Sequence, residues 1–136
     1  MGSSFAIKII SIILATLFVI LLGFGPKPLY EEYPNTVWVS NDPQIYMTVS
    51  SSPYDHSGSY VVVNGEKIEV VLYISKREDL AHINLLSADG KSGTTVLVGD
   101  HVRINDSEIS WNVTHDYLFD EAYSTITLER QRDGTD

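Results

Sequence analysis

Cysteine is absent from this chain. Its absence excludes disulfide bonds, thiolate metal ligands and a cysteine nucleophile, and it leaves no residue to carry the lipid of a lipoprotein. Glycine-rich phosphate-binding patterns are absent as well, both the dinucleotide-binding type and the P-loop type. The sequence therefore gives no support to nucleotide chemistry, and we expect no cofactor.

Positive charge is scarce. Nine Lys and Arg residues stand against eighteen Asp and Glu residues, for a net charge of −9. A nucleic-acid-binding protein normally carries a basic surface, so this balance argues against nucleic acid as a partner. The acidic balance suits a basic protein partner or divalent ions, and it also serves solubility.

One long apolar run is present, from Phe5 to Gly25, and it is interrupted by a single charge, Lys8. Its length is close to the roughly 20 residues that a helix needs to cross a bilayer. The positive-inside rule compares Lys8 before the run with Lys27 after it and favours a cytoplasmic N-terminus. We therefore predict a single-pass transmembrane helix, with membrane contact through residues 5–25 and an extracytoplasmic C-terminal domain.

A cleaved signal peptide is the alternative interpretation of the same run, and it would give a secreted protein. The run is longer than the usual apolar region of a signal peptide. The small-x-small site Gly23-Phe24-Gly25 is followed directly by Pro26, which disfavours cleavage there. We predict an uncleaved anchor.

The composition divides the chain into four parts. They are an anchor or uncleaved signal over 1–25, a Pro-rich stalk over 26–35, a β domain over 36–131 and a disordered tail over 132–136. Prolines 26, 28 and 34 predict that the stalk is an extended, semi-rigid spacer.

Apolar and polar residues alternate with period two through most of the third part, which is typical of strands with one buried face. The alternation is longest over Glu66–Ser75, and the Asn64-Gly65 dipeptide before it predicts a type I′ hairpin. The predicted strands are Val37–Ser40, Ile45–Val49, Tyr60–Val63, Glu66–Ser75, Ala81–Ser87, Thr94–Val98, His101–Asn105, Ser107–Thr114 and Tyr123–Gln131. Eight or nine short strands without helical crossovers predict an all-β fold, an antiparallel β-sandwich or small barrel.

His115 and Asp116 are the candidate catalytic pair, because a histidine beside carboxylates can serve as a base or a metal ligand. Adjacent strand residues point to opposite faces, so the two cooperate only where the strand ends. In the alternative interpretation, Asp116 begins a turn and accepts backbone N–H groups while residues 117–119 close one end of the core. We favour the turn and assign no catalytic or metal-binding residue.

A contact surface is predicted at two places. The Ser-rich loop that contains Tyr54, Asp55 and His56 is polar and long, as binding loops on β scaffolds often are. Tyr46 and Tyr73 occupy solvent-side positions of their strands and would form an aromatic patch if those strands were neighbours. The alternative for the tyrosines is a role in cross-strand packing.

A resemblance to known proteins is carried by Asn41–Tyr46, Val63–Val70, Asp116–Asp120, Tyr123 and Ile126–Leu128. These segments resemble small, N-terminally membrane-anchored, functionally unassigned extracytoplasmic proteins of Gram-positive bacteria. The resemblance implies a bacterial cell-surface address. Together with the anchor it favours a non-catalytic binding or interaction module with a protein partner. A hydrolase or metal-dependent enzyme centred on His115 and Asp116, or a structural component of the cell envelope, remain as alternatives.

Overall fold

The computed structural model describes residues 27–52 and 58–132. The predicted anchor, including Phe5 and Gly25, lies outside this part of the chain, as does all of the tail except Arg132. No helix in the described part is long and apolar enough to cross a membrane. The elements are α2 (Leu29–Glu32), β1 (Thr36–Asn41), β2 (Gln44–Val49), β3 (Tyr60–Val63), β4 (Glu66–Ser75), β5 (Leu80–Leu86), β6 (Ser92–Ile104), β7 (Glu108–Asp116) and β8 (Thr125–Gln131).

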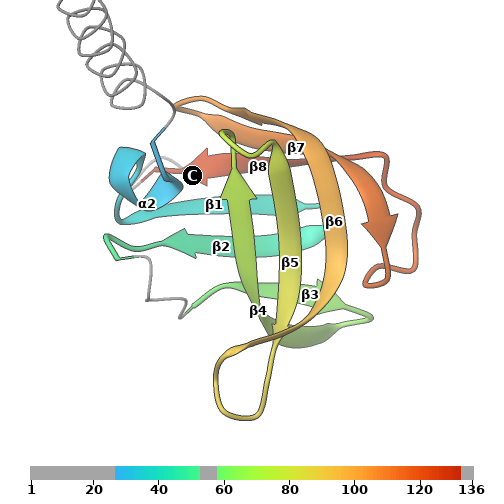
Figure 1. The fold of residues 1–136 in the computed structure, drawn as a ribbon. Coiled ribbons are helices and arrows are strands. Elements are labelled where there is room, and N and C mark those ends of the chain that lie inside the picture. The colour runs from blue at the N-terminus through green and yellow to red at the C-terminus, as the bar shows by residue number, and fades with distance from the viewer. Residues whose placement is uncertain (1–26, 53–57, 133–136) are drawn as a thin grey trace, which may run out of the picture.

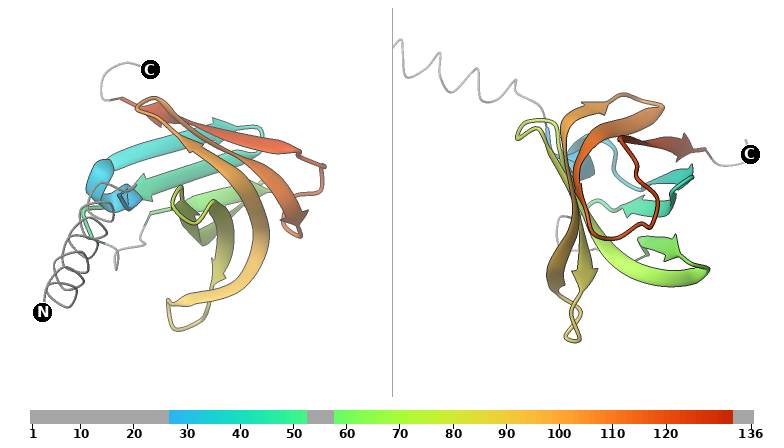
Figure 2. Two further views of the ribbon diagram at one scale, coloured as in Figure 1. Left: turned by 45° about the horizontal axis from the view of Figure 1, so that its top comes forward. Right: turned by 90° about the vertical axis from the view of Figure 1, so that its right-hand side faces the viewer.

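The eight strands form a closed antiparallel barrel in which each strand pairs with the next one along the chain (Figure 1). Closure comes from pairing between the last strand and the first, with Val37 opposite Gln131 and Val39 opposite Glu129. Figure 2 shows from two further directions how the sheet curls round on itself. The all-β antiparallel prediction is confirmed, and of its two forms the structure has the barrel and not the sandwich.

Period-two alternation correctly predicts the buried side of β2 but not of every strand, since Val71 of β4 was predicted on the solvent side and is buried. On β2, Ile45, Met47 and Val49 are buried, as the alternation requires. The β3–β4 hairpin turns at Asn64 and Gly65, whose φ angles of 53° and 78° are the positive values that a type I′ turn needs. Local sequence signals thus fix both the strands and this turn.

The barrel interior is filled by apolar side chains, which is how a barrel of eight strands is commonly packed. Trp38 and Trp111 are its largest members and are fully buried. The core contains Trp38, Ile45, Met47, Val49, Val61, Val70, Ile74, Ala81, Ile83, Val96, Leu97, Val102, Ile109, Trp111, Ile126 and Leu128. We call the end of the barrel beside α2 the α2 end, and the opposite end, where β7 connects to β8, the far end.

The two strands predicted on either side of Gly99-Asp100 are one strand, β6, so the predicted turn there is wrong. A β-bulge absorbs the turn-like residues: the register with β7 shifts after Asp100, and His101 has a φ of 52°. The Val102 N–H donates to Asp79 Oδ1 at 2.7 Å. Gly99 is needed for packing and not for turning, because a Cβ there would lie 2.3 Å from Trp111 Cδ1.

The segment predicted as an extended spacer is packed against the barrel where the structure describes it. Pro28 O accepts the N–H groups of Glu31 and Glu32, at 3.0 and 3.1 Å, which starts the single turn of α2. Leu29 and Tyr30 pack against the core, as does Tyr33 just after the helix. Apolar side chains between the prolines explain the difference, because they bury surface that an extended spacer would leave in water.

The far end is closed by the connection from β7 to β8. Asp116 Oδ1 accepts the backbone N–H groups of Leu118 at 2.8 Å and Phe119 at 3.0 Å, so it does begin a turn. Leu118, Phe119 and Tyr123 pack against the core. Tyr117 does not join them, because its side chain is 78% exposed. The predicted closure is therefore right for two of its three residues.

Candidate functional site: a groove between β2 and β4

A groove opens at the α2 end because β3 is too short to separate its neighbours along their whole length. In the described residues, β3 pairs with β2 over Gln44–Tyr46 and with β4 over Glu66–Glu69. Beyond those pairs, Met47–Val49 and Leu72–Ser75 face a shared hollow of about 310 Å³. This volume is at the lower limit of the roughly 300–1,000 Å³ found for small-molecule sites.

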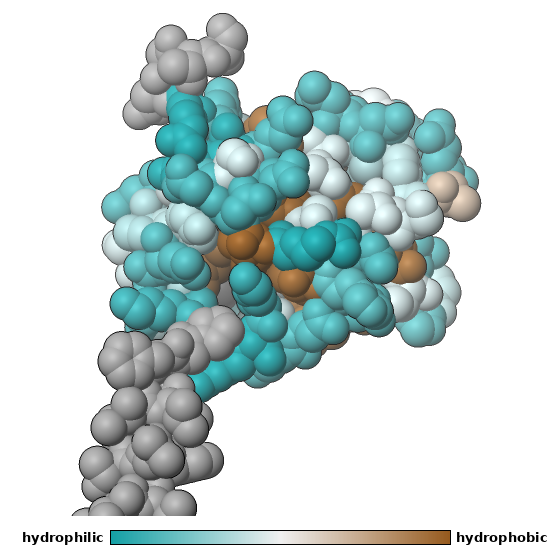
Figure 3. Space-filling model, turned by 90° about the horizontal axis from the view of Figure 1, so that it is seen from above, coloured by the Kyte–Doolittle hydropathy of each residue, from teal (hydrophilic) through white to brown (hydrophobic). Residues whose placement is uncertain are grey.

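The walls of the groove are largely apolar. β2 contributes Met47 and Val49, and β4 contributes Leu72 and Ile74. The remaining apolar lining is formed by Leu29 and Tyr30 of α2 and by Ile104 at the end of β6. Figure 3, which looks down on the loops of the α2 end, shows apolar surface in the middle of this face with polar side chains around it. The groove therefore offers an apolar surface within a polar border.

Three cations line the groove: Lys27, Lys76 and Arg77. All three are exposed. Ion pairs within the described residues are limited to His101 with Asp100 and Asp106 with two arginines, so none of the three cations has a carboxylate partner there. A third of the chain's nine basic residues thus gathers at one opening of a protein whose net charge is −9.

Glu78 is the one acidic residue among the described residues of the lining, and Tyr73 engages it. The Tyr73 hydroxyl donates to Glu78 Oε2 at 2.6 Å, and this hydrogen bond raises the pKa of Tyr73. The ring of Tyr73 stacks on His82 of β5, with 4.9 Å between centroids. Burial lowers the pKa of His82, which favours its neutral form. The outer wall of the groove is therefore held by a chain of contacts from Glu78 through Tyr73 to His82.

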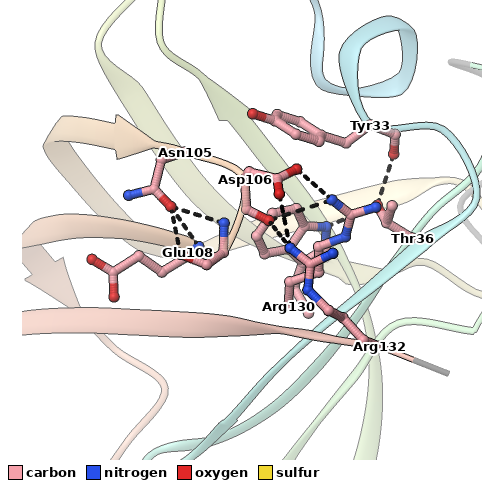
Figure 4. Close-up of polar contacts among 9 residues, drawn as sticks. Tyr33, Thr36, Asn105, Asp106, Glu108, Arg130 and Arg132 are labelled. Carbon is pink, nitrogen blue, oxygen red and sulfur yellow. Dashed lines mark hydrogen bonds and ion pairs between the residues drawn. The ribbon is translucent and has the colours of Figure 1, made fainter. Parts of the chain in front are cut away.

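A second set of contacts fixes the loops of the α2 end (Figure 4). Asp106, in the β6–β7 turn, accepts from Arg130 Nη1 at 2.7 Å and from Arg132 Nη2 at 2.8 Å. The hydrogen bond from Arg132, together with the charge of Arg130, holds the pKa of Asp106 below its usual value. The Arg130 guanidinium lies 5.8 Å from the centroid of the Tyr33 ring, next to α2. Asp106 thereby joins the end of β8 to the turn that follows Ile104.

The same end is fastened from inside the barrel. Trp38 Nε1 donates to Thr36 Oγ1 at 2.9 Å, and Thr36 Oγ1 donates to the Tyr33 carbonyl at 2.7 Å. Tyr33 and Trp38 also meet edge to face, with 5.6 Å between ring centroids. These contacts place α2, and with it Leu29 and Tyr30, at a fixed position on the groove.

Tyr46 and Tyr73, predicted as a contact patch, lie apart because β3 stands between their strands. Tyr46 instead stacks on Tyr60 of β3, with 5.0 Å between centroids. It borders a second hollow, of about 580 Å³, over β1, β2, β3 and β8. Tyr73 lines the groove, so the structure brings one of the two predicted tyrosines to the candidate site. The other predicted contact residues, Tyr54, Asp55 and His56, lie outside the described residues.

His115 and Asp116 are not arranged as a catalytic pair. His115 is exposed, and its Nδ1 lies 3.3 Å from Thr114 Oγ1. Asp116 is committed to the turn at the far end through its Oδ1. The other described histidines are separate, since His82 stacks on Tyr73 and His101 bonds to Asp100 at 2.8 Å. Across 27–52 and 58–132, no three His, Asp or Glu residues are grouped as metal ligands.

Comparisons with protein-family models, with curated proteins and with solved structures find no match to this chain. The groove must therefore be interpreted from its own residues. Sequence reasoning missed Lys27, Lys76, Arg77 and Leu72 as site residues. One signal was available: Lys76-Arg77 is the one pair of adjacent basic residues in this acidic sequence, and it follows the clearest predicted strand.

Proposed function

We propose that this protein is a membrane-tethered, extracytoplasmic, non-catalytic binding module, and that the groove between β2 and β4 is its binding site. The observation that carries the proposal is the groove itself, with apolar walls and three cations that lack carboxylate partners in the described residues. A concave apolar surface with a few converging polar groups is the usual form of a ligand site. A bacterial cell surface is the address that the sequence favours for it.

The position of the groove supports a tethered function. Lys27 and Pro28, the first described residues after the apolar run Phe5–Gly25, line it directly. A tether formed by that run would hold the α2 end near the membrane, with the far end directed away from it. Tethering raises the local concentration of a module relative to anything held at the same surface.

Site-specific photo-cross-linking in the cells that make the protein tests this proposal. A photoreactive phenylalanine derivative replaces Tyr73 in the groove and, as the matched control, Tyr117 at the far end, which is 78% exposed. We expect an adduct of defined mass from position 73 and none of that mass from position 117. Equal adducts from both positions, or an adduct from position 117 alone, would contradict the groove as the binding site.

A further inference from the structure

We infer that the groove binds an anionic phospholipid of the membrane, with a hydrocarbon chain against its apolar walls and the phosphate at its cations. This inference rests on the proposed function and adds the chemical class and source of the ligand. It follows from three properties of the site: the apolar character of its walls, the sign of the charge among its described residues and its place in the chain.

The apolar walls reach into the barrel interior. Met47, Val49 and Ile74 of the lining also belong to the buried core, so the groove opens directly onto core side chains. Leu72 and Leu29 extend the same surface toward the opening and are half-buried. A hydrocarbon chain placed there would remove apolar surface from water on both sides of the contact, which is the main favourable term in such binding.

The charged groups of the lining match an anion at the outer end of that chain. Lys27, Lys76 and Arg77 supply ammonium and guanidinium donors, and guanidinium binds phosphate oxygens in a bidentate manner. Glu78, the opposing charge, accepts from the Tyr73 hydroxyl. The local sign of charge at the groove is therefore opposite to that of the whole protein, which is −9. A basic protein partner, which the net charge alone would suggest, does not suit this opening.

The position of the groove close to the apolar run indicates that the ligand comes from the membrane. Lys27 and Pro28 line the groove and follow Gly25, the last residue of the apolar run, by two and three positions. A site this close to a bilayer lies within reach of lipid headgroups, and Lys or Arg residues at that level are attracted to anionic lipids. The cations at the far end, Lys67 and Lys91, line neither the groove nor the hollow at Tyr46 in the described structure.

Photoactivatable lipids provide the test. The full chain is assembled into nanodiscs that contain, at equal mole fraction, a diazirine-bearing phosphatidylglycerol, a phosphatidylcholine with the same acyl chains, or a free fatty acid. After illumination, peptide mass spectrometry maps the labelled residues. The variant is Lys76→Gln with Arg77→Gln, both in an exposed turn, and the matched control is Lys67→Gln with Lys91→Gln at the far end.

We expect phosphatidylglycerol to label the groove walls around Leu72 and Ile74 more strongly than phosphatidylcholine. The groove variant should reduce this labelling about twenty-five-fold, since it removes two basic residues and each one near a membrane surface contributes on the order of a fivefold preference for anionic lipid. The far-end variant should leave it unchanged.

Equal labelling by the two phospholipids, or labelling that the groove variant does not reduce, would overturn the inference. Labelling by the fatty acid alone would show that the groove binds an anionic amphiphile. It would overturn the proposal that this ligand is a membrane phospholipid. If none of the three lipids labels the groove, and position 73 gives a protein adduct in cells, the proposal of a lipid ligand is overturned. The proposal that the groove is a binding site is then retained. A peptide bound in the groove would give that last result.

Discussion

The two ends of the barrel use the same fold in opposite ways. At the far end, the β7–β8 connection turns inward at Asp116 and covers the core with Leu118 and Phe119. At the α2 end, the loops are fixed around an opening, and core side chains such as Met47 and Ile74 line it. One end therefore covers the hydrophobic core with a loop, and the other has a hollow that borders buried core side chains.

Charge follows the same division. The small hollow at the far end is lined by Asp42, Asp120 and Glu121, and the Tyr123 hydroxyl donates to Asp42 at 2.7 Å. Among the described residues, the groove is lined by three cations and one carboxylate. The negative net charge of the chain agrees in sign with the far end but not with the groove. Local placement of charge, and not the total, determines which ligand each end can accept.

The largest expected difference is in the free energy of unfolding, between a substitution that enlarges a side chain in the packed interior and one that enlarges a side chain in the groove. Gly99→Ala would place a Cβ 2.3 Å from Trp111 Cδ1 and 2.5 Å from the Asn112 carbonyl, which is backbone and cannot move aside. We expect a loss of about 3 kcal/mol in the free energy of unfolding. Leu72→Phe adds more atoms but places them in the groove, so we expect a change within about 1 kcal/mol.

Denaturant unfolding followed by tryptophan fluorescence measures both variants, since Trp38 and Trp111 are buried in the core. Similar losses in the two variants would mean that the groove has no more room than the interior. That result would remove the distinction between a filled interior and an accessible groove.

A smaller effect is expected from the turn that closes the far end. Asp116→Ala removes the acceptor of the Leu118 and Phe119 N–H groups, and we expect a loss of about 1–2 kcal/mol. Asp120→Ala, in the same connection but exposed, should change the free energy of unfolding by less than about 0.5 kcal/mol. Both are measured by chemical denaturation. If the two variants lose equal stability, the closure does not depend on the Asp116 turn.

The smallest effects are the titrations of two histidines, His82, which stacks on Tyr73 of the groove, and His101 of β6. Burial lowers the pKa of His82, so its contribution to stability is present above about pH 6.5 and is lost as the pH falls through its folded-state pKa. The hydrogen bond with Asp100 raises the pKa of His101, so its contribution is present below about pH 6.5 and is lost as the pH rises through its folded-state pKa. NMR titration of the imidazole resonances should place His82 below His101. The reverse order would mean that the stack of Tyr73 on His82 is not maintained in solution.

Local patterns in the sequence predict most of the strands. Alternation finds β2 and β4 within a residue or two, and Asn64-Gly65 finds the hairpin between β3 and β4. The turn at Asp116 is predictable for the same reason, because a side-chain acceptor acts on N–H groups two and three residues away. The long strand β6 is not, because its bulge depends on a bond from Val102 to the distant Asp79.

Barrel closure and the groove depend on contacts between residues far apart in the chain. Val37 pairs with Gln131, and no local pattern specifies that pairing. The groove combines α2, β2, β4 and the end of β6, and it exists because β3 has four residues where β4 has ten. The Tyr46–Tyr73 patch required the two strands to be neighbours, and strand order places β3 between them.

The most direct test of the difference between the two ends uses a phosphatidylglycerol that carries a nitroxide on its acyl chain. The full chain, with labelled methyl groups, is placed in nanodiscs with this lipid, and paramagnetic broadening is measured at Leu72 and Ile74 in the groove and at Val63 and Leu118 at the far end. We predict strong broadening at the groove methyls that falls in the variant Lys76→Gln with Arg77→Gln, and little broadening at the far end. Equal broadening at both ends, or broadening that this variant leaves unchanged, would contradict the account.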